Sequence, residues 1–76
     1  MIWKEVNSAL EKEFEFNNFI EAFAFLTKVA MLSERANHHP EIFNVYNRVK
    51  LRLTTHVLGN TISDRDRKLA KQIDEL

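Results

Sequence analysis

All three histidines of the chain fall in one short stretch, with His38 and His39 adjacent in the run Asn37-His38-His39-Pro40 and His56 following. Histidine is the side chain that titrates nearest to neutral pH, so it serves most often as a proton donor or acceptor. The cluster therefore predicts a site that transfers protons, provided that the fold brings the three rings together.

Two carboxylates are expected to reach this cluster. Glu34 falls in the last turn before the histidine pair, and a carboxylate beside an imidazole stabilises the imidazolium and orients the ring. Asp66 lies on the inward-looking side of the last helix. However, Ser63 stands three residues before Asp66, a weak capping-box pattern in which the aspartate would serve the helix start instead. Both interpretations of Asp66 stay open.

A zinc site is the alternative for three histidines and two carboxylates. Zinc usually takes about four ligands in a tetrahedral array, and adjacent histidines suit that geometry poorly. The chain contains neither an H-x-x-x-H nor an H-E-x-x-H pair, and it has no cysteine to supply a thiolate ligand or nucleophile. A metal is therefore the less favoured interpretation.

Composition limits the classes of function. The 76 residues, 45% of them apolar, predict a single domain over 1–76 that buries only about 60 to 65% of its unfolded surface, which favours self-association. Acidic and basic residues number 11 each, so no net charge attracts a nucleic acid. Because neither a signal peptide nor a membrane-spanning stretch is apparent, we expect a soluble cytoplasmic protein without membrane or nucleic-acid partners.

The period of the apolar residues predicts three elements in the first half of the chain. A first strand is expected over Ile2–Val6 and a second over Leu10–Phe16, where strict alternation puts one lysine, Lys12, on the apolar face. Asn17-Asn18 supplies the N-cap of a helix over Phe19–Ala36. The apolar face of this helix is broader than one sheet would cover, which suggests a partner surface such as another subunit.

The second half repeats this order. Pro40 ends the helix at or before the histidine pair, so the pair lies on a loop. Strands are expected over Phe43–Tyr46 and Arg48–Val57, and alternation in the second points His56 to its polar face. Ser63 opens the last helix. The fold class is therefore α+β: a four-stranded antiparallel sheet with two helices packed on one face, in the order β-β-α-β-β-α.

Two smaller expectations concern the sheet. Tyr46 is expected to pack across it. The basic row of the fourth strand is expected to be a solvated face that pairs with the acidic row of the second strand. These rows are Arg48, Lys50 and Arg52, and Glu11, Glu13 and Glu15.

The spacing of these residues resembles the signature of the pterin-4a-carbinolamine dehydratase family. The pattern begins with Glu34 and continues, after three residues, with His38-His39-Pro40. Tyr46 follows after five residues and His56 after nine more, and an Arg65-Asp66 pair stands at the start of the last helix. The similarity continues through 43–49 and, more loosely, from Trp3 to Leu76. It covers essentially the whole chain.

The resemblance implies dehydration of 4a-hydroxytetrahydrobiopterin to quinonoid dihydrobiopterin in tetrahydrobiopterin recycling, with no metal, nucleotide or redox cofactor. It makes His38, His39 and His56 the catalytic group and Glu34 and Asp66 the orienting carboxylates. We expect His38 or His39 to be the base and His56 the acid. Residues implied in pterin binding are Asn37, Pro40, Thr54, Thr55, Val57 and Arg65.

The resemblance also implies a homodimer or homotetramer, in agreement with the broad apolar face of the first helix. A non-catalytic dimerisation or regulatory partner on the same scaffold is the alternative function. The segment Val57-Leu58-Gly59-Asn60 departs from the acidic and small residues common in the family and is one residue longer. The chain also starts close to its first strand, which we interpret as a minimal version of the fold.

Overall fold

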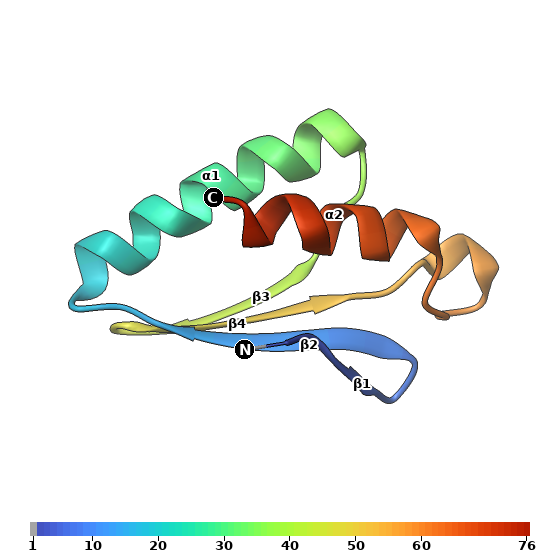
Figure 1. Cartoon of the computed structure of the whole chain (residues 1–76), viewed down its shortest axis with the longest axis horizontal. Helices are drawn as coiled ribbons and strands as arrows, with labels where there is room; N and C mark the ends of the chain where they lie inside the picture. Colours follow the sequence, from blue (N-terminus) through green and yellow to red (C-terminus); the bar gives the residue numbers. More distant parts are fainter. Residues whose placement is uncertain (1) are drawn as a thin grey trace.

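Four strands and two long helices follow one another in the predicted order. The computed structural model describes residues 2–76, apart from the side chain of Leu58. The elements are β1 (Lys4–Val6), β2 (Ala9–Glu15), α1 (Phe19–Ala36), β3 (Glu41–Val45), β4 (Arg48–Leu53), the short 3-10 helix η1 (His56–Leu58) and α2 (Asp64–Asp74). Both helices lie on the same face of the sheet (Figure 1), so the predicted fold class is confirmed.

The sheet has the strand order β1-β2-β4-β3, and every neighbouring pair is antiparallel. The long chain segment that contains α1 therefore separates the two strands, β2 and β4, that pair at the centre. The predicted pairing of the acidic and basic rows is confirmed by the register between β2 and β4. The partners are Glu11 with Arg52, Glu13 with Lys50 and Glu15 with Arg48.

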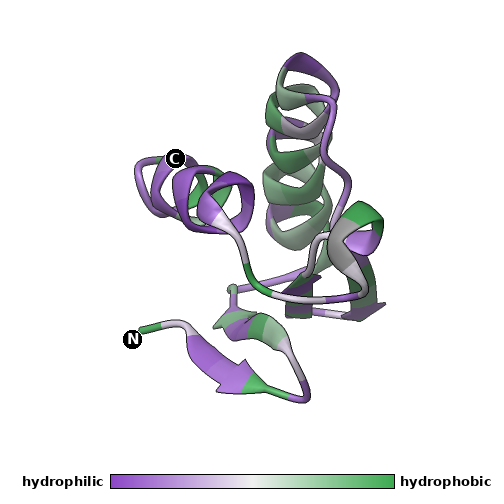
Figure 2. Cartoon of the chain, turned by 90° about the vertical axis from the view of Figure 1, so that its right-hand side faces the viewer, coloured by the Kyte–Doolittle hydropathy of each residue, from purple (hydrophilic) through white to green (hydrophobic). Residues whose placement is uncertain are grey.

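The core lies between the sheet and the helices. Leu51 and Leu53 of β4 are fully buried against Val29 of α1 and against Leu69 and Ile73 of α2. In Figure 2, α1 is largely apolar whereas α2 is largely hydrophilic, so α1 carries more apolar surface than α2 does. Burial of these aliphatic side chains is the main source of stability in a chain without cysteine.

Lys12, the lysine expected on the apolar face of the second strand, has a specific partner. Its Nζ lies 2.8 Å from Oδ1 of Asp74 at the end of α2, and the indole N–H of Trp3 donates to the same carboxylate. The side chain of Lys12 is mostly buried. This contact joins β1 and β2 to the last turn of α2, so the lysine fixes the helix against the sheet.

Asn18 caps α1, and its removal should weaken the fold modestly. Its side-chain oxygen accepts a hydrogen bond from the backbone N–H of Glu21 at 2.9 Å. An Asn18→Ala variant is expected to lose about 1 kcal/mol of unfolding free energy, measured by urea denaturation. Asn17→Ala is the matched control, because the side-chain amide of Asn17 makes only a 3.4 Å contact with Glu21. Equal losses of unfolding free energy in the two variants would contradict the capping role.

The fourth strand is shorter than predicted. It ends at Leu53 rather than at Val57, because Thr55 forms an isolated bridge with Thr61 and His56 begins a 3-10 turn. Gly59 closes that turn in the left-handed region at φ 77° and donates its N–H to the carbonyl of His56. The predicted strand end was therefore wrong, and His56 is oriented by a turn instead of by strand alternation, although it is exposed and lies away from the buried leucines as expected.

Other boundaries differ by one or two residues. The third strand is Glu41–Val45 rather than Phe43–Tyr46, and Tyr46 occupies the hairpin turn at φ 51°. Tyr46 is 61% exposed, so the expectation that it packs across the sheet was also wrong.

Neither helix of the described chain combines the length and the hydropathy that crossing a bilayer requires.

Candidate functional site

The end of α1 places the histidine pair. Asn37 adopts the left-handed conformation at φ 50°, and its N–H donates back to the carbonyl of Glu34. The N–H of His38 then donates to the carbonyl of Ser33, which turns the chain sharply. As a result the two adjacent rings differ in environment: His38 is only 8% exposed, whereas the side chain of His39 is 57% exposed.

His38 is paired with a buried carboxylate. Its Nε2 lies 2.5 Å from Oδ1 of Asp66, which is fully buried. The other carboxylate oxygen of Asp66 accepts hydrogen bonds from the backbone N–H of Ser63 at 2.8 Å and from the hydroxyl of Thr55 at 2.7 Å. The predicted capping box of α2 is thus confirmed, and the same carboxylate also reaches the histidine cluster through His38.

Asp66 is ionised in this setting. Burial alone would raise its pKa, but hydrogen bonds from His38, Ser63 and Thr55 stabilise the carboxylate, and the net effect lowers the pKa below the ordinary aspartate value. An ionised carboxylate can only accept hydrogen bonds. Facing an ionised carboxylate, Nε2 of His38 is therefore the donor of this contact and Asp66 the acceptor.

The other two histidines have exposed partners. Nε2 of His39 lies 2.6 Å from Oε1 of Glu34, as the position of Glu34 in the last helical turn predicted. Since the Glu34 side chain is 79% exposed, water screens this pair and it contributes little to stability. His56 contacts the side-chain oxygen of Asn60 through Nδ1 at 2.6 Å. The role of Asn60 was not predicted, although its place four residues after His56 in the glycine turn was a usable signal.

The three rings line one surface depression. It has a volume of about 290 Å³ and is formed by the loop after α1, the segment after β4 with η1, and the start of α2. Its lining residues are Asn37, His38, His39, Thr55, His56, Val57 and Arg65. We call it the histidine depression. The fold therefore brings together residues that lie up to 28 positions apart in the chain.

Four predicted site residues do not line this depression. Glu34 and Asp66 contact the rings of His39 and His38, as orienting groups would. Thr54 is buried, and its hydroxyl donates to the carbonyl of Ser8 in the turn between β1 and β2. Pro40 is half-buried at the start of β3 and ends the loop. Among residues 2–76, no three His, Cys, Asp or Glu side chains are grouped as metal ligands.

Comparison with known proteins identifies the family. The family model described as pterin 4 alpha carbinolamine dehydratase matches residues 2–76. The chain belongs to the pterin-4-alpha-carbinolamine dehydratase family. Two similar curated proteins carry this dehydratase name provisionally. A protein of Prochlorococcus marinus (strain NATL2A) is 54% identical over 97% of this chain and 77% of its own length, and one of Synechococcus sp. (strain WH7803) is 50% identical over 97% and 78%.

Solved structures agree with the pterin dehydratase fold. A transcriptional coactivator/pterin dehydratase from Brucella melitensis superposes with a TM-score of 0.90 at 37% identity, covering 96% of this chain and 79% of that one. A pterin dehydratase-like protein identified as a RuBisCO assembly factor in the alpha-carboxysome has a TM-score of 0.83 at 29% identity, covering 99% and 88%. The described roles differ, so this fold serves more than one role.

Thr55 holds the aspartate of this pterin dehydratase fold in place. Its side chain is buried, and its hydroxyl donates to Asp66 and contacts the hydroxyl of Ser63 at 2.6 Å. A Thr55→Val variant is expected to lose about 1.5 to 3 kcal/mol of unfolding free energy, because a buried carboxylate loses a donor. Thr55→Ser is the matched control and should stay near wild type in urea denaturation. Equal stability of the valine variant would show that the hydroxyl is dispensable.

Proposed function

We propose that the protein dehydrates a 4a-hydroxytetrahydropterin, such as 4a-hydroxytetrahydrobiopterin, to the quinonoid dihydropterin and water, in tetrahydrobiopterin recycling. The observation that carries this proposal is the histidine depression, in which three imidazoles, each contacted by a side-chain oxygen, share one surface in a member of this family. The reaction requires two proton transfers, and these rings supply the groups for both.

The reaction balances without any other reactant. A base removes the proton from the ring nitrogen next to the carbinol carbon, and the electrons of that N–H bond form a C=N double bond. The C–O bond of the carbinol breaks at the same carbon, and an acid donates a proton to the leaving oxygen, which departs as water. Each of these proton transfers is typically worth about 10² to 10⁴ in rate.

The ring partners support a division of roles. His38 faces the ionised Asp66, and a carboxylate stabilises the imidazolium that forms when a ring accepts a proton. We assign the base role to His38, with His39 and Glu34 as the second pair of this kind. His56 has an amide partner instead of a carboxylate, so no neighbouring carboxylate holds its proton, and we assign it the acid role.

The walls of the histidine depression supply the proposed pterin contacts. Asn37 and Arg65 offer polar groups to the edge of the ring, while Val57, which is 81% exposed, offers an apolar surface to its face. Thr55 lines the wall of the depression, but we do not assign its hydroxyl to the pterin, because this hydroxyl already donates to Asp66. We do not assign Thr54 a polar contact, because its hydroxyl binds the Ser8 carbonyl.

A dehydration assay tests the proposed function. A 4a-hydroxytetrahydropterin is generated in solution, and its loss of water is followed with wild-type protein and with buffer alone. We expect a clear acceleration by the wild type and the loss of this acceleration in a His56→Ala variant. Because the ring of His56 is exposed in the wild type, its removal should leave the fold intact. A wild-type rate equal to that of buffer would reject the dehydratase function.

A non-catalytic dimerisation or regulatory partner role is the second candidate, and one surface supports its dimerisation part. Large apolar side chains of α1 stay exposed to solvent, as the broad apolar face of this helix predicted; these are Phe19, Ile20, Phe23 and Met31. We propose that they join copies of the chain into a homodimer or homotetramer. Sedimentation of the wild type and of Phe23→Ser with Met31→Ser would show a smaller species in the variant, and a wild-type monomer would reject the assembly.

A further inference from the structure

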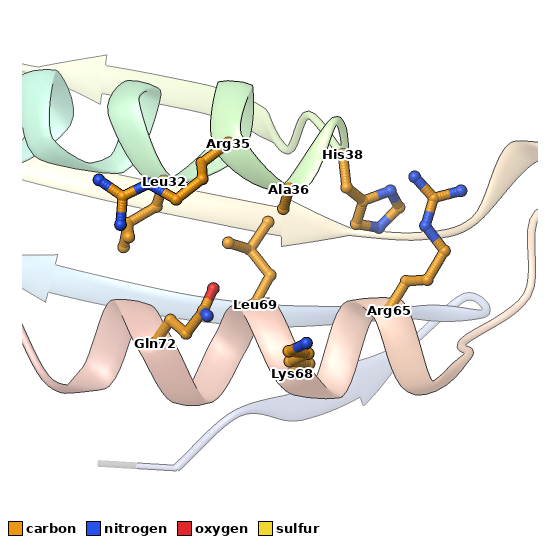
Figure 3. A pocket seen from close by; sticks show the side chains of 8 residues that line it. All are labelled: Leu32, Arg35, Ala36, His38, Arg65, Lys68, Leu69 and Gln72. Atoms are coloured by element: carbon orange, nitrogen blue, oxygen red, sulfur yellow. The ribbon is translucent and has the colours of Figure 1, made fainter.

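A second hollow adjoins the histidine depression. It runs between α1 and α2, with a volume of about 430 Å³, and His38 closes one end (Figure 3). Helix α1 contributes Leu32, Arg35 and Ala36, and α2 contributes Arg65, Lys68, Leu69 and Gln72. We call it the cationic groove.

The charge of this groove has one sign. Three basic side chains, Arg35, Arg65 and Lys68, line it, and no acidic residue does. Across residues 2–76, no carboxylate lies within ion-pair distance of Arg35 or Lys68. Since the whole chain carries 11 acidic and 11 basic residues, this positive charge is a local concentration and not the result of a basic protein.

Arg65 connects the two hollows. Arg65 and His38 line both the cationic groove and the histidine depression. One Nη of Arg65 donates to the carbonyl of Asn37 at 2.6 Å, which holds the guanidinium beside His38, as Figure 3 shows. A guanidinium has five N–H donors, so further donors remain for a ligand. A molecule with its reacting ring in the depression can therefore extend past Arg65 into the groove.

We propose that the cationic groove binds an anionic group, a phosphate or a carboxylate, on the tail of the substrate whose ring reacts beside the histidines. Arginine matches the geometry of both anions, and lysine adds a point charge. Gln72 supplies an amide donor, and Leu32 and Leu69 supply apolar walls for the linking part of the tail. The identity of the ring rests on the proposed function.

Binding of inorganic tripolyphosphate tests the groove without any catalysis. Titration of the wild type, followed by backbone NMR shifts, should perturb the facing residues of α1 and α2, Arg35, Lys68 and Gln72 among them. The double variant Arg35→Gln with Lys68→Gln is expected to bind about five- to thirtyfold more weakly. Lys28→Gln with Lys71→Gln is the matched control, because it removes two charges from the same helices outside the groove.

The control also separates a site from general attraction. Equal weakening in the two double variants, or shifts confined to other parts of the chain, would overturn the proposal, because non-specific attraction depends only on net charge. Wild-type affinity retained by the control and lost by the groove variant supports it. This result does not depend on whether the protein dehydrates a pterin.

The substrate tail is tested by a pair of carbinolamines that differ only in phosphorylation of the side chain. The groove variant should raise KM for the phosphorylated compound and leave KM for the neutral compound unchanged. An unchanged KM for both, with wild-type activity intact, would overturn the assignment to the tail while the dehydratase function stands. If no pterin is converted at all, the dehydratase function and the tail assignment both fail, and the tripolyphosphate titration still decides whether the groove binds anions.

Discussion

A His38→Gln variant is expected to keep its fold and to lose about 10² to 10⁴ of its dehydration rate. Glutamine can still donate an N–H toward Asp66, so the carboxylate is not left without this partner. It cannot take up and release a proton near neutral pH, however, and that is the step assigned to His38. The measurement is the initial rate of water loss from a 4a-hydroxytetrahydropterin, with thermal unfolding as a check of the fold.

The comparison with His38→Ala separates chemistry from structure. Alanine removes both the proton transfer and the donor to the buried Asp66 carboxylate, and leaving such an acceptor without its partner costs about 1 to 3 kcal/mol. We expect the alanine variant to be slow and unstable, whereas the glutamine variant is slow and close to wild type in stability. Full activity of the glutamine variant would show that His38 has only a structural role.

An Asp66→Ala variant is expected to lose about 3 to 5 kcal/mol of unfolding free energy. The variant leaves the N–H of Ser63, the hydroxyl of Thr55 and the ring of His38 without their common acceptor. A domain of this length is typically stable by about 4 to 11 kcal/mol, so much of the protein could unfold. Urea denaturation measures the loss.

Asp64→Ala is the matched control for this loss. Asp64 stands in the same first turn of α2 but is exposed, so its removal should cost only about 0.3 to 1 kcal/mol through the helix dipole. If both variants lost the same free energy, the contribution of Asp66 would be that of any acidic residue at a helix start. The buried hydrogen bonds of Asp66 would then add nothing to the free energy of unfolding beyond the helix-dipole contribution.

The contribution of Asp66 should also depend on pH. Its pKa in the folded state is lowered, so the carboxylate stabilises the fold above the ordinary aspartate pKa of about 3.9. That stabilisation is lost as the pH falls from about 3.9 through the lower pKa of the folded state. The stability difference between wild type and Asp66→Asn should therefore be largest near neutral pH and shrink below about pH 4. A difference independent of pH would contradict this linkage.

Local sequence signals determined the paired rows of the sheet and the ends of the first helix. The alternation from Leu10 onward defined the paired rows of β2 and β4, because strand side chains alternate between two faces whatever lies elsewhere in the fold. The cap at Asn18 and the block at Pro40 bounded a helix that runs over the predicted Phe19–Ala36, because both act on the backbone within a few residues. Glu34 was expected beside the histidine pair for the same reason, and it contacts His39.

Only the tertiary structure decided how the site is assembled. The predicted fourth strand ran too far, through His56 to Val57, because strand alternation holds only while a chain stays paired in a sheet, and here the pairing ends at Leu53. The contact of His38 with Asp66 joins the end of one helix to the start of another, 28 residues later, through the packing of α1 against α2. The cationic groove has the same origin, since it exists only where these two helices lie side by side (Figure 3). The sequence by itself determined which titratable groups are present and the local partner of His39, whereas long-range packing decided the pairing of His38 with Asp66 and brought the three rings to one surface.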